Sequence, residues 1–330
     1  MKKFSLLAAL VLFIFSCQNE SISNVNINKS EENQLSINMD PNAEWQYKNL
    51  RLYPVTSNAV FANSAIQHLK TLSEAMQTPG FRVLERKQFG RGNEPWYNGL
   101  TVQNKTQDTV LLMAGDVVTG GNQDRVMAHH EVVLPGTVKN VEVFCVEAGR
   151  STYYNQSASQ AEKSVGAFRG YYNVASPQVR HAVHTTGEQE DVWAAVARVT
   201  EANGANSDTK AYAALEKANE QKAKRDAYLS FFEDKFSDDP TVVGVVAVSG
   251  DKVLGIDVLG DHDLFQRQFP HLVHGYVAEA AILESVASLS EAEIQRAFKS
   301  VAKLRNQDEK PTDTAGRFAL GNDWVHLYKK

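Results

Sequence analysis

Residues 242–258 read VVGVVAVSGDKVLGIDV, and this stretch predicts two neighbouring β-strands. Valine and isoleucine dominate Val242–Val248 and Val253–Val258, and β-branched side chains fit an extended, half-buried backbone. The four residues between the two segments, SGDK, are typical of a tight turn. The stretch therefore predicts a β-hairpin in the second half of the chain.

Helical patterns lie on both sides of this hairpin. Apolar residues recur there at intervals of three and four, the spacing of one helix face. Ser290 and Glu293 form a capping box, because the serine can accept from a free backbone N–H and the glutamate from the reciprocal one. The predicted helices are Gln189–Asn203, Asp208–Phe236, His271–Val286 and a helix from Ser290 to about Leu304. Gly316–Tyr328 predicts a closing hairpin.

The first half of the folded chain predicts mainly antiparallel strands. Ala62–Gln77 has a helical pattern, which Pro79-Gly80 ends. Short apolar segments flank polar or Pro-Gly turns, at 100–102, 109–112, 131–134 and 141–146. We therefore predict an α+β fold. Its N-terminal half is rich in antiparallel strands with one helix, and its C-terminal half is helical with a β-hairpin and a closing hairpin.

The N-terminus predicts a lipoprotein signal. Lys2 and Lys3 precede an apolar run of about ten residues, and a bilayer-spanning helix needs roughly 20. Such a run is typical of a secretory signal that is removed. The segment Ile14–Cys17 resembles a bacterial lipobox, which implies cleavage before Cys17 and lipid on its thiol. An ordinary secretory signal with an incidental cysteine is the alternative.

A flexible tether is predicted after the signal, because residues 17–43 are rich in Asn, Ser, Glu and Gln. The predicted organisation is a signal at 1–16, a tether at 17–43 and one α+β domain at 44–330, with a possible subdivision near 150–185. Gln18, rather than an aspartate, resembles the outer-membrane sorting pattern. We therefore expect a lipid-anchored protein of the bacterial cell envelope, on the outer membrane.

Composition excludes some partners. Without residues 1–16 the chain keeps 32 basic and 39 acidic residues, a net charge of −7. Nucleic-acid binding requires clustered Lys and Arg, so we expect no nucleic-acid partner. With Cys17 acylated, Cys145 is the single remaining cysteine, which leaves no intramolecular disulfide.

The most distinctive stretch runs from Gly115 to Arg150. It contains Gly115-Asp116, the segment GGNQDRV at 120–126, Leu134-Pro135 and VFCVEAGR at 143–150. Later segments share the same pattern: Val192-Trp193, Ser207, Thr209, Val243-Gly244, Gly250, Gly255-Ile256-Asp257 and Val325-His326-Leu327.

Together these segments resemble the domain family associated with ADP-ribosylglycohydrolases and rhodanese-phosphatases. The resemblance spans about Leu50 to Leu327. Ser151 stands where the family pattern usually has a tryptophan. The resemblance implies a family of unknown activity, with a pointer towards ADP-ribose or NAD metabolism.

A glycine turn is the first candidate site. Gly120 and Gly121 allow positive φ and close approach of a ligand, and successive N–H groups in such a turn can hold an anion. Arg125 could hold a phosphate or carboxylate with its planar fork. The predicted ligand-binding residues are Gly120, Gly121, Gln123, Asp124, Arg125 and Arg150. The alternative is a structural turn in which Arg125 pairs with a carboxylate such as Glu147.

Cys145, Glu147 and Asp257 are the candidate catalytic residues. Cys145 and Glu147 share one face of a strand, and a cation beside a thiol lowers its pKa. The alternative is a buried, inert Cys145, because free cysteine often behaves as a small hydrophobe. Asp257 and Asp261 could form an acid–base pair, but capping of the next helix explains them as well.

Histidines do not predict a metal site. His129 and His130 are adjacent on a strand, so their side chains point to opposite faces and cannot chelate one ion without a bulge. No metal ligand set and no cofactor is therefore predicted. Two functions remain open. One is a membrane-anchored binding or assembly module whose protein partner is unknown. The other is an exported hydrolase or transferase for an ADP-ribose- or NAD-like or phosphorylated small molecule.

Overall fold

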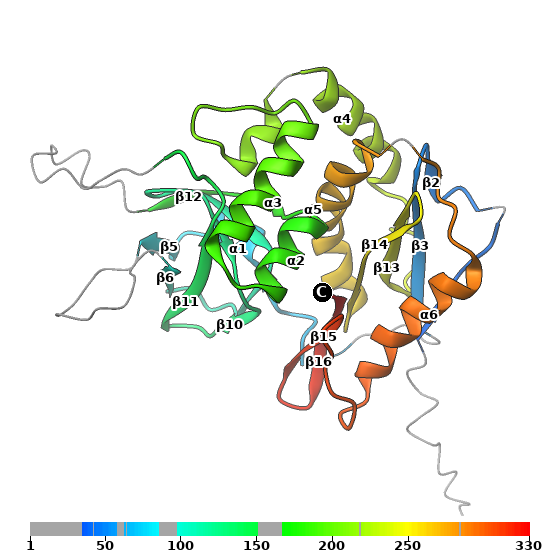
Figure 1. Cartoon of the computed structure of the whole chain (residues 1–330). Helices are drawn as coiled ribbons and strands as arrows, with labels where there is room; N and C mark the ends of the chain where they lie inside the picture. The colour runs from blue at the N-terminus through cyan, green and yellow to red at the C-terminus, as the bar shows by residue number, and fades with distance from the viewer. Residues whose placement is uncertain are drawn as a thin grey trace, which may run out of the picture.

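The computed structural model describes residues 35–41, 43–57, 63, 65–85, 98–150, 167–217, 219–283 and 285–330. Cys17, the signal and Ser151 lie outside these ranges. The described chain is a mixed α+β fold of three sheets and six α-helices (Figure 1), as the patterns predicted at this level. Among the described residues, no helix combines the length and apolar character that crossing a bilayer requires.

A seven-stranded antiparallel sheet is built around the predicted hairpin. The hairpin strands β13 and β14 pair side by side, and β14 pairs with β16 of the closing hairpin. The strands are β1 (Leu35–Ile37), β2 (Gln46–Tyr47), β3 (Leu50–Ser57), β13 (Val242–Ser249), β14 (Lys252–Leu259), β15 (Ala315–Leu320) and β16 (Asp323–Lys329). Residues 35–37, which the composition placed in the tether, thus form a strand beside β3.

Two helices cover the two faces of this sheet. Alternate side chains of β13 point to opposite faces: Val245 packs with α5 (His262–Ala280), whereas Val246 packs with α6 (Glu291–Ala302). Ser290 and Glu293 form the predicted capping box of α6. Helix α5 begins nine residues earlier than the pattern 271–286 indicated, because Asp261 caps it by accepting from the Leu264 N–H.

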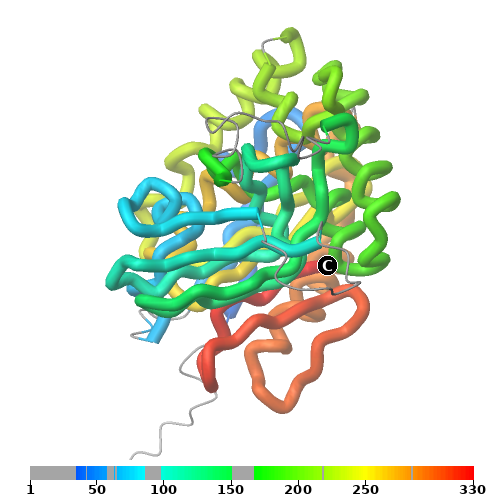
Figure 2. Tube along the Cα trace, turned by 90° about the vertical axis from the view of Figure 1, so that its left-hand side faces the viewer, coloured from blue at the N-terminus to red at the C-terminus, as the bar shows by residue number. Residues whose placement is uncertain are grey.

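The remaining strands form two smaller sheets. The six-stranded sheet has the order β12-β8-β9-β11-β6-β5, and the three-stranded sheet has the order β10-β7-β4. In Figure 2 the cyan-to-green part of the chain that contains these strands faces the viewer. Their strands are β4 (Lys70–Thr71), β5 (Phe81–Glu85), β6 (Gly99–Asn104), β7 (Val110–Leu112), β8 (Asp116–Gly120), β9 (Arg125–Met127), β10 (Glu131–Val133), β11 (Val138–Cys145) and β12 (Phe168–Val174). The β4–β7 pair is parallel, so the N-terminal half is not wholly antiparallel.

Two predicted helices are shorter than expected. Helix α1 covers only Leu72–Met76, because Thr71 and Glu74 form a capping box that starts it. The stretch 208–236 divides into a 3-10 helix, η3 (Tyr212–Glu216), and α4 (Glu220–Phe232), since the Asn219 side chain caps α4. Helix α3 (Gln189–Ala202) agrees with its prediction, and α2 (Pro177–Thr185) was not predicted.

Candidate functional site

The glycine turn joins β8 to β9 and is closed by the protein's own carboxylates. Gly120 and Gly121 have φ values of 112° and 57°, in the region that glycine favours. Asp124 Oδ1 accepts from the Gly120 N–H at 2.9 Å, and Glu85 Oε1 accepts from the Asn122 N–H at 2.7 Å. These amides, which a bound anion would use, therefore already have acceptors.

Glu147 and Arg150 join this turn from the end of β11. Glu147 Oε2 accepts from the Asp124 N–H at 3.1 Å and from Arg150 Nε at 2.7 Å. Arg150 Nη2 also donates to Asp124 Oδ1 at 3.1 Å. Burial raises the pKa of Asp124 to about 6, and the Glu147 charge adds to the rise while Arg150 opposes it. The partner of Glu147 is thus Arg150 rather than Arg125.

Arg125 points into the protein, with only 1% of the residue exposed. Its Nη1 donates to Gln123 Oε1 at 2.9 Å, and Gln123 Nε2 donates to the Glu147 carbonyl at 3.1 Å. The predicted residues do come together, and most of their polar groups bind each other, although the buried Arg125 Nε has no hydrogen-bond partner among the described residues. We call this set the turn network: Gly120, Gly121, Gln123, Asp124, Arg125, Glu147 and Arg150. A ligand at this network stays a prediction, and neither cavity described below is lined by it.

Cys145 lies buried beside the turn network on β11. Its backbone exchanges two hydrogen bonds of 2.8 Å with the Gln189 side chain, and its Sγ accepts from the Glu147 N–H at 3.4 Å. Burial raises the pKa of the thiol. A raised pKa disfavours the thiolate, which is the reactive form, so this environment fits an inert side chain.

Asp257 is the centre of a second buried network. It lies on β14 with none of its surface exposed. Arg180 of α2 binds its carboxylate through both terminal nitrogens, with Nη1–Oδ1 at 2.8 Å and Nη2–Oδ2 at 3.1 Å. The Tyr276 hydroxyl on α5 donates to Oδ2 as well. A charged pair this deep requires such multiple bonds to offset desolvation.

Two glycines make room for the Arg180 side chain. A Cβ at Gly115 would lie 2.8 Å from Arg180 Cδ, closer than real Cβ contacts allow. A Cβ at Gly255 would lie 2.5 Å from Tyr276 Cε1 and 3.2 Å from Arg180 Nη2. The glycines of the Gly115-Asp116 and Gly255-Ile256-Asp257 segments therefore have a steric role at this network.

Two histidines extend the network from Asp257 to the N-terminal half. His326 Nε2 lies 3.0 Å from Asp257 Oδ1, and His130 Nε2 lies 2.7 Å from His326 Nδ1. A carboxylate only accepts hydrogen bonds, so His326 carries its proton on Nε2 and accepts at Nδ1 from the His130 Nε2–H. The hydrogen bonds of the two neutral imidazoles therefore run in one direction, and the lone pair at their end is on His130 Nδ1. We call these residues the Asp257 network: His130, Arg180, Asp257, Tyr276 and His326.

Charge in the Asp257 network is concentrated on one ion pair. Burial alone would raise the pKa of Asp257, but Arg180 and His326 hold it well below its usual range. Burial lowers the pKa of both His326 and His130. The carboxylate and guanidinium are therefore charged at neutral pH while the two imidazoles are neutral.

His129 and Asp261 take no part in this network. The exposed His129 pairs with Glu142 at 3.1 Å, whereas its neighbour His130 points inward. The two side chains diverge, but both residues lie between β9 and β10 rather than on a strand, so strand alternation is not the reason. Asp261 caps α5, and Asp257 does not form an acid–base pair with it. Within the described ranges, no three His, Cys, Asp or Glu side chains are placed to hold a metal ion.

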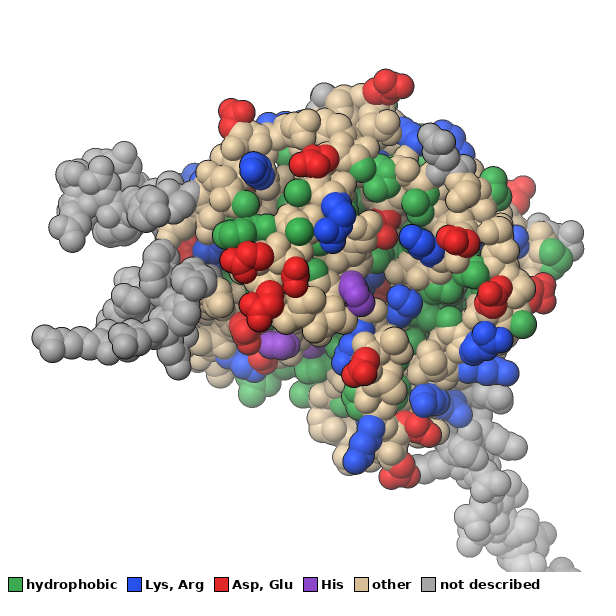
Figure 3. Space-filling view, in the orientation of Figure 1, with side chains coloured by type: hydrophobic (Ala, Val, Ile, Leu, Met, Phe, Trp, Pro, Cys, Tyr) green, Lys and Arg blue, Asp and Glu red, His purple; other side chains and the backbone are tan. Residues whose placement is uncertain are grey.

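A groove of about 400 Å³ borders the Asp257 network. It lies between the start of α2, the start of β14 and the end of β16, and basic side chains gather over these elements near the centre of the face in Figure 3. Its lining consists of Pro177, Gln178, Arg180, His181, Lys252, Val253, Leu254, Glu279, Lys329 and Lys330. We call this the basic groove.

The basic groove carries more positive than negative charge. Asp257 neutralises Arg180, which leaves Lys252, Lys329 and Lys330 opposite one carboxylate, Glu279. Burial lowers the pKa of Lys329, and the Arg180 charge lowers it further. An anion in the groove would relieve this repulsion between cations. The groove therefore has the electrostatics of an anion site.

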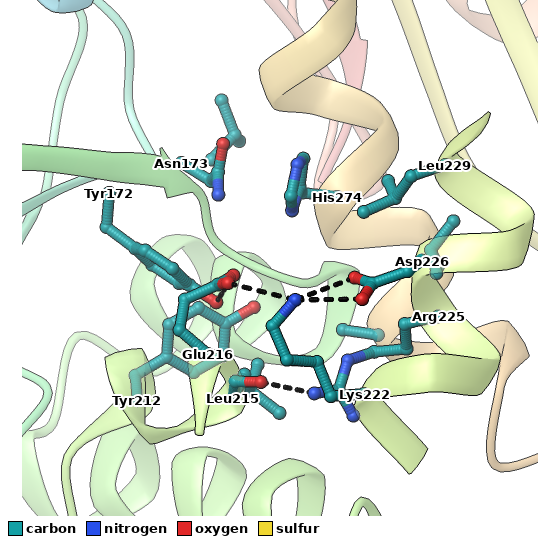
Figure 4. A pocket seen from close by; sticks show the side chains of 13 residues that line it. Tyr172, Asn173, Tyr212, Leu215, Glu216, Lys222, Arg225, Asp226, Leu229 and His274 are labelled. Atoms are coloured by element: carbon teal, nitrogen blue, oxygen red, sulfur yellow. Dashed lines mark hydrogen bonds and ion pairs between the residues drawn. The ribbon is translucent and has the colours of Figure 1, made fainter. Parts of the chain in front are cut away.

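A second cavity, between β12, η3, α4 and α5, is much smaller and already neutralised. It encloses about 10 Å³, close to the space that one water needs. Lys222 lies between the carboxylates of Glu216 and Asp226, at 3.7 and 2.8 Å (Figure 4). Arg225 donates inward to the Leu215 carbonyl. Its charged groups are matched within the protein, so this cavity is a weaker candidate than the basic groove.

Sequence reasoning found Asp257 but missed the residues around it. Arg180 and Glu279 lie in segments without a motif, and their roles depend on α2 and α5 meeting at β14. His326 was noticed only as part of Val325-His326-Leu327. Lys329 and Lys330 form a basic pair at the end of an apolar strand, which could have indicated an anion site. The sequence did not show which elements lie beside that strand.

The comparisons identify a family and nothing closer. The family model described as the ARG and Rhodanese-Phosphatase-superfamily-associated Protein domain matches residues 38–326. This range includes both buried networks and most of the groove. No curated protein and no solved structure matches the chain.

Proposed function

The chain belongs to the ARG and Rhodanese-Phosphatase-superfamily-associated Protein domain family, and from this premise we propose that it is a membrane-anchored binding module of the bacterial cell envelope. Its folded part holds an anionic small molecule in the basic groove, and lipid on Cys17 anchors it to the outer membrane. The family description points to no specific ligand, so the ligand class is inferred from the groove.

One observation carries the ligand proposal: three lysines face a single carboxylate in a groove of about 400 Å³. Small-molecule sites typically have volumes of roughly 300–1,000 Å³. Arg180 forms a fixed wall of the groove, because its guanidinium is bound to Asp257. A rigid wall with lysines around it fits a phosphorylated or nucleotide-like molecule, in which the lysines contact the anionic group.

The test is a ligand screen by thermal unfolding, using the chain from residue 18 onwards. Sulfate, phosphate, phosphosugars, ADP-ribose and NAD are compared at equal ionic strength. A ligand at about 100 times its Kd adds roughly 2.7 kcal/mol to the free energy of unfolding, and each kcal/mol raises Tm by roughly 2–4 °C.

Two exposed lysines provide the matched variants. Lys252→Ala removes a groove charge, and Lys299→Ala removes one on α6. We expect Lys252→Ala to weaken binding by about three- to tenfold, corresponding to about 1 kcal/mol, and Lys299→Ala to leave it unchanged. Equal effects of the two variants, or no ligand-induced shift with any anion, would contradict binding in the groove.

A second candidate function is an exported hydrolase or transferase for an ADP-ribose- or NAD-like or phosphorylated molecule. The ordered chain from Asp257 through His326 to His130 favours it, because such a chain orients an imidazole for proton transfer. Turnover of a ligand found in the screen, followed by mass spectrometry, separates the two functions. The enzyme requires product formation that His130→Gln abolishes while ligand binding persists.

The anchor is tested separately from the groove. Cys17→Ala in the chain from Met1 removes the thiol that would carry the lipid. Several acyl chains on this residue would otherwise hold the protein on the membrane. We expect loss of labelling by a palmitate analogue and loss of the protein from the detergent phase. Unchanged partitioning of the variant into detergent would contradict the lipoprotein assignment.

A further inference from the structure

Glu279 is the single carboxylate side chain in the lining of the basic groove. It lies near the end of α5 and is 6% exposed. Its Oε1 accepts from the backbone N–H of Gln178, at the first turn of α2. That hydrogen bond holds one carboxyl oxygen at the start of α2, on the side of the groove that faces the lysines.

Several charged and titratable groups face this carboxyl. Arg180 comes from α2, Lys252 from β14 and Lys329 from β16, and these three cations favour the ionised form. The Tyr212 hydroxyl of η3 also interacts with it, since the pKa of Tyr212 is raised by burial and by the Glu279 charge. His181 and Lys330 complete the titratable lining of the groove.

Burial nevertheless dominates at Glu279. It raises the pKa of Glu279 to about 7 even though the Gln178 N–H and the three cations lower it. The carboxyl therefore exchanges its proton close to neutral pH. A second negative charge brought into the same groove would repel the carboxylate and favour the acid form further.

We propose that the basic groove binds an oxyanion of the sulfate or phosphate type together with a proton, and that Glu279 takes up that proton. This inference rests on the proposed anion binding in the groove. The neutral carboxyl removes the repulsion and adds an O–H that can donate to the anion, while the lysines contribute the positive charge.

Proton uptake makes affinity depend on pH in a defined direction. Below about pH 7 Glu279 is already protonated in the free protein, so affinity for sulfate is constant. Above this pH each bound anion must bring its proton from solution, and Kd rises by up to about tenfold per pH unit. The groove would thus release its anion as pH increases.

Calorimetric titration of the soluble chain with sulfate tests this linkage. Sulfate does not titrate near neutral pH, so any proton that is taken up belongs to the protein. Titrations at pH 7 and 8, each in two buffers with different heats of ionisation, give the number of protons per bound sulfate. We expect about half a proton at pH 7 and nearly one at pH 8.

Three variants assign the proton to its residue. Glu279→Gln keeps an acceptor for the Gln178 N–H but cannot titrate, and it should bind sulfate without proton uptake and with a pH-independent Kd. Lys329→Arg and His181→Gln each replace another titratable side chain of the groove lining. Both should retain the proton uptake, because each leaves Glu279 in place and Lys329→Arg keeps its charge.

The outcomes separate the two proposals. Binding of sulfate without proton uptake in the wild-type chain would overturn the role of Glu279 and leave the anion groove intact. Proton uptake that survives in Glu279→Gln but is lost in Lys329→Arg or His181→Gln would also overturn the role of Glu279. Failure of sulfate, phosphate and every other anion to bind would overturn the proposed function itself. The wild-type titrations alone can overturn either proposal, so the test does not depend on the folding of any variant.

Discussion

The turn network and the Asp257 network are both buried and charged, yet they differ in what lies beside them. In the turn network, Glu147 and Asp124 share Arg150, and the backbone amides are bound to carboxylates of the same protein. In the Asp257 network, Arg180 is held on one side by Asp257 and lines a 400 Å³ groove on the other. The difference indicates that a cluster of polar residues becomes a candidate site only where it borders accessible space.

The two networks also differ in how much they depend on one carboxylate. Arg180 is buried with Asp257 as its only salt-bridge partner within the described residues, whereas the side chain of Arg150 is 31% exposed. Loss of Asp257 leaves a buried charge without its partner, while Arg150 can turn to water if Glu147 is lost. The loss of a carboxylate should therefore cost more stability in the Asp257 network than in the turn network.

Asp257→Ala should produce the largest loss of stability. Removing one member of a buried ion pair costs about 3–5 kcal/mol, because the remaining charge stays desolvated. Glu147→Ala should cost less, about 1–3 kcal/mol, since Arg150 is partly solvated. Urea unfolding of both variants measures the difference in free energy. Equal losses of unfolding free energy would contradict the difference in solvation between Arg180 and Arg150.

The free energy of unfolding should depend on pH with opposite signs in the two networks. The pKa of Asp124 is raised to about 6 in the folded chain, so the folded state binds more protons than the unfolded state between about pH 4 and 6. Its contribution therefore lowers stability as pH rises through this window, by up to about 3 kcal/mol. Asp257 has the opposite sign: its lowered pKa adds stability above about pH 4, which is lost on acidification.

Asp124→Asn checks the first of these signs. Asparagine keeps an acceptor for the Gly120 N–H but has no titratable group. Unfolding free energies measured by urea at pH 4, 5, 6 and 7 should decline less in the variant than in the wild type. A wild-type curve that rises steadily from pH 4 to 6, and is unaffected by the substitution, would contradict a raised pKa at this position.

Cys145→Ala should have the smallest effect. Replacing a buried thiol by a methyl group removes little volume, and we expect a loss of about 1 kcal/mol. Sulfate affinity should not change, because Cys145 belongs to the strand beside the turn network rather than to the groove. A thiol reagent should modify the wild-type residue only when the chain unfolds. Rapid labelling of the folded chain would reverse this assignment.

Local patterns predicted the segments of this fold better than their pairing. The 242–258 hairpin, the Ser290–Glu293 capping box and α3 follow from short-range spacing, and each formed as expected. The strand segments near 100 and 110 also formed, but β6 and β7 joined different sheets. Pairing depends on which apolar faces meet in space, and a single chain's periodicity contains no information about that.

The same limit explains the site. Asp257 was a candidate because of its place in the Gly255-Ile256-Asp257 segment and its proximity in sequence to Asp261. Its partners Arg180 and His326 are 77 and 69 residues away in the chain. The glycine turn attracted attention because its residues are neighbours in sequence. Proximity in sequence favoured the closed network, whereas the groove required elements that meet only after folding.

The order of strands in the seven-stranded sheet has a consequence for folding. Strand β3 pairs with β13 through residues such as Pro54 and Val245, and β14 pairs with β16 at the far end of the chain. Closing such long loops costs chain entropy before any pairing compensates it, which slows folding. A ribosome would have to release nearly all of the polypeptide before this sheet could close. The seven-stranded sheet would therefore complete its pairing late in synthesis, after β16 has left the ribosome.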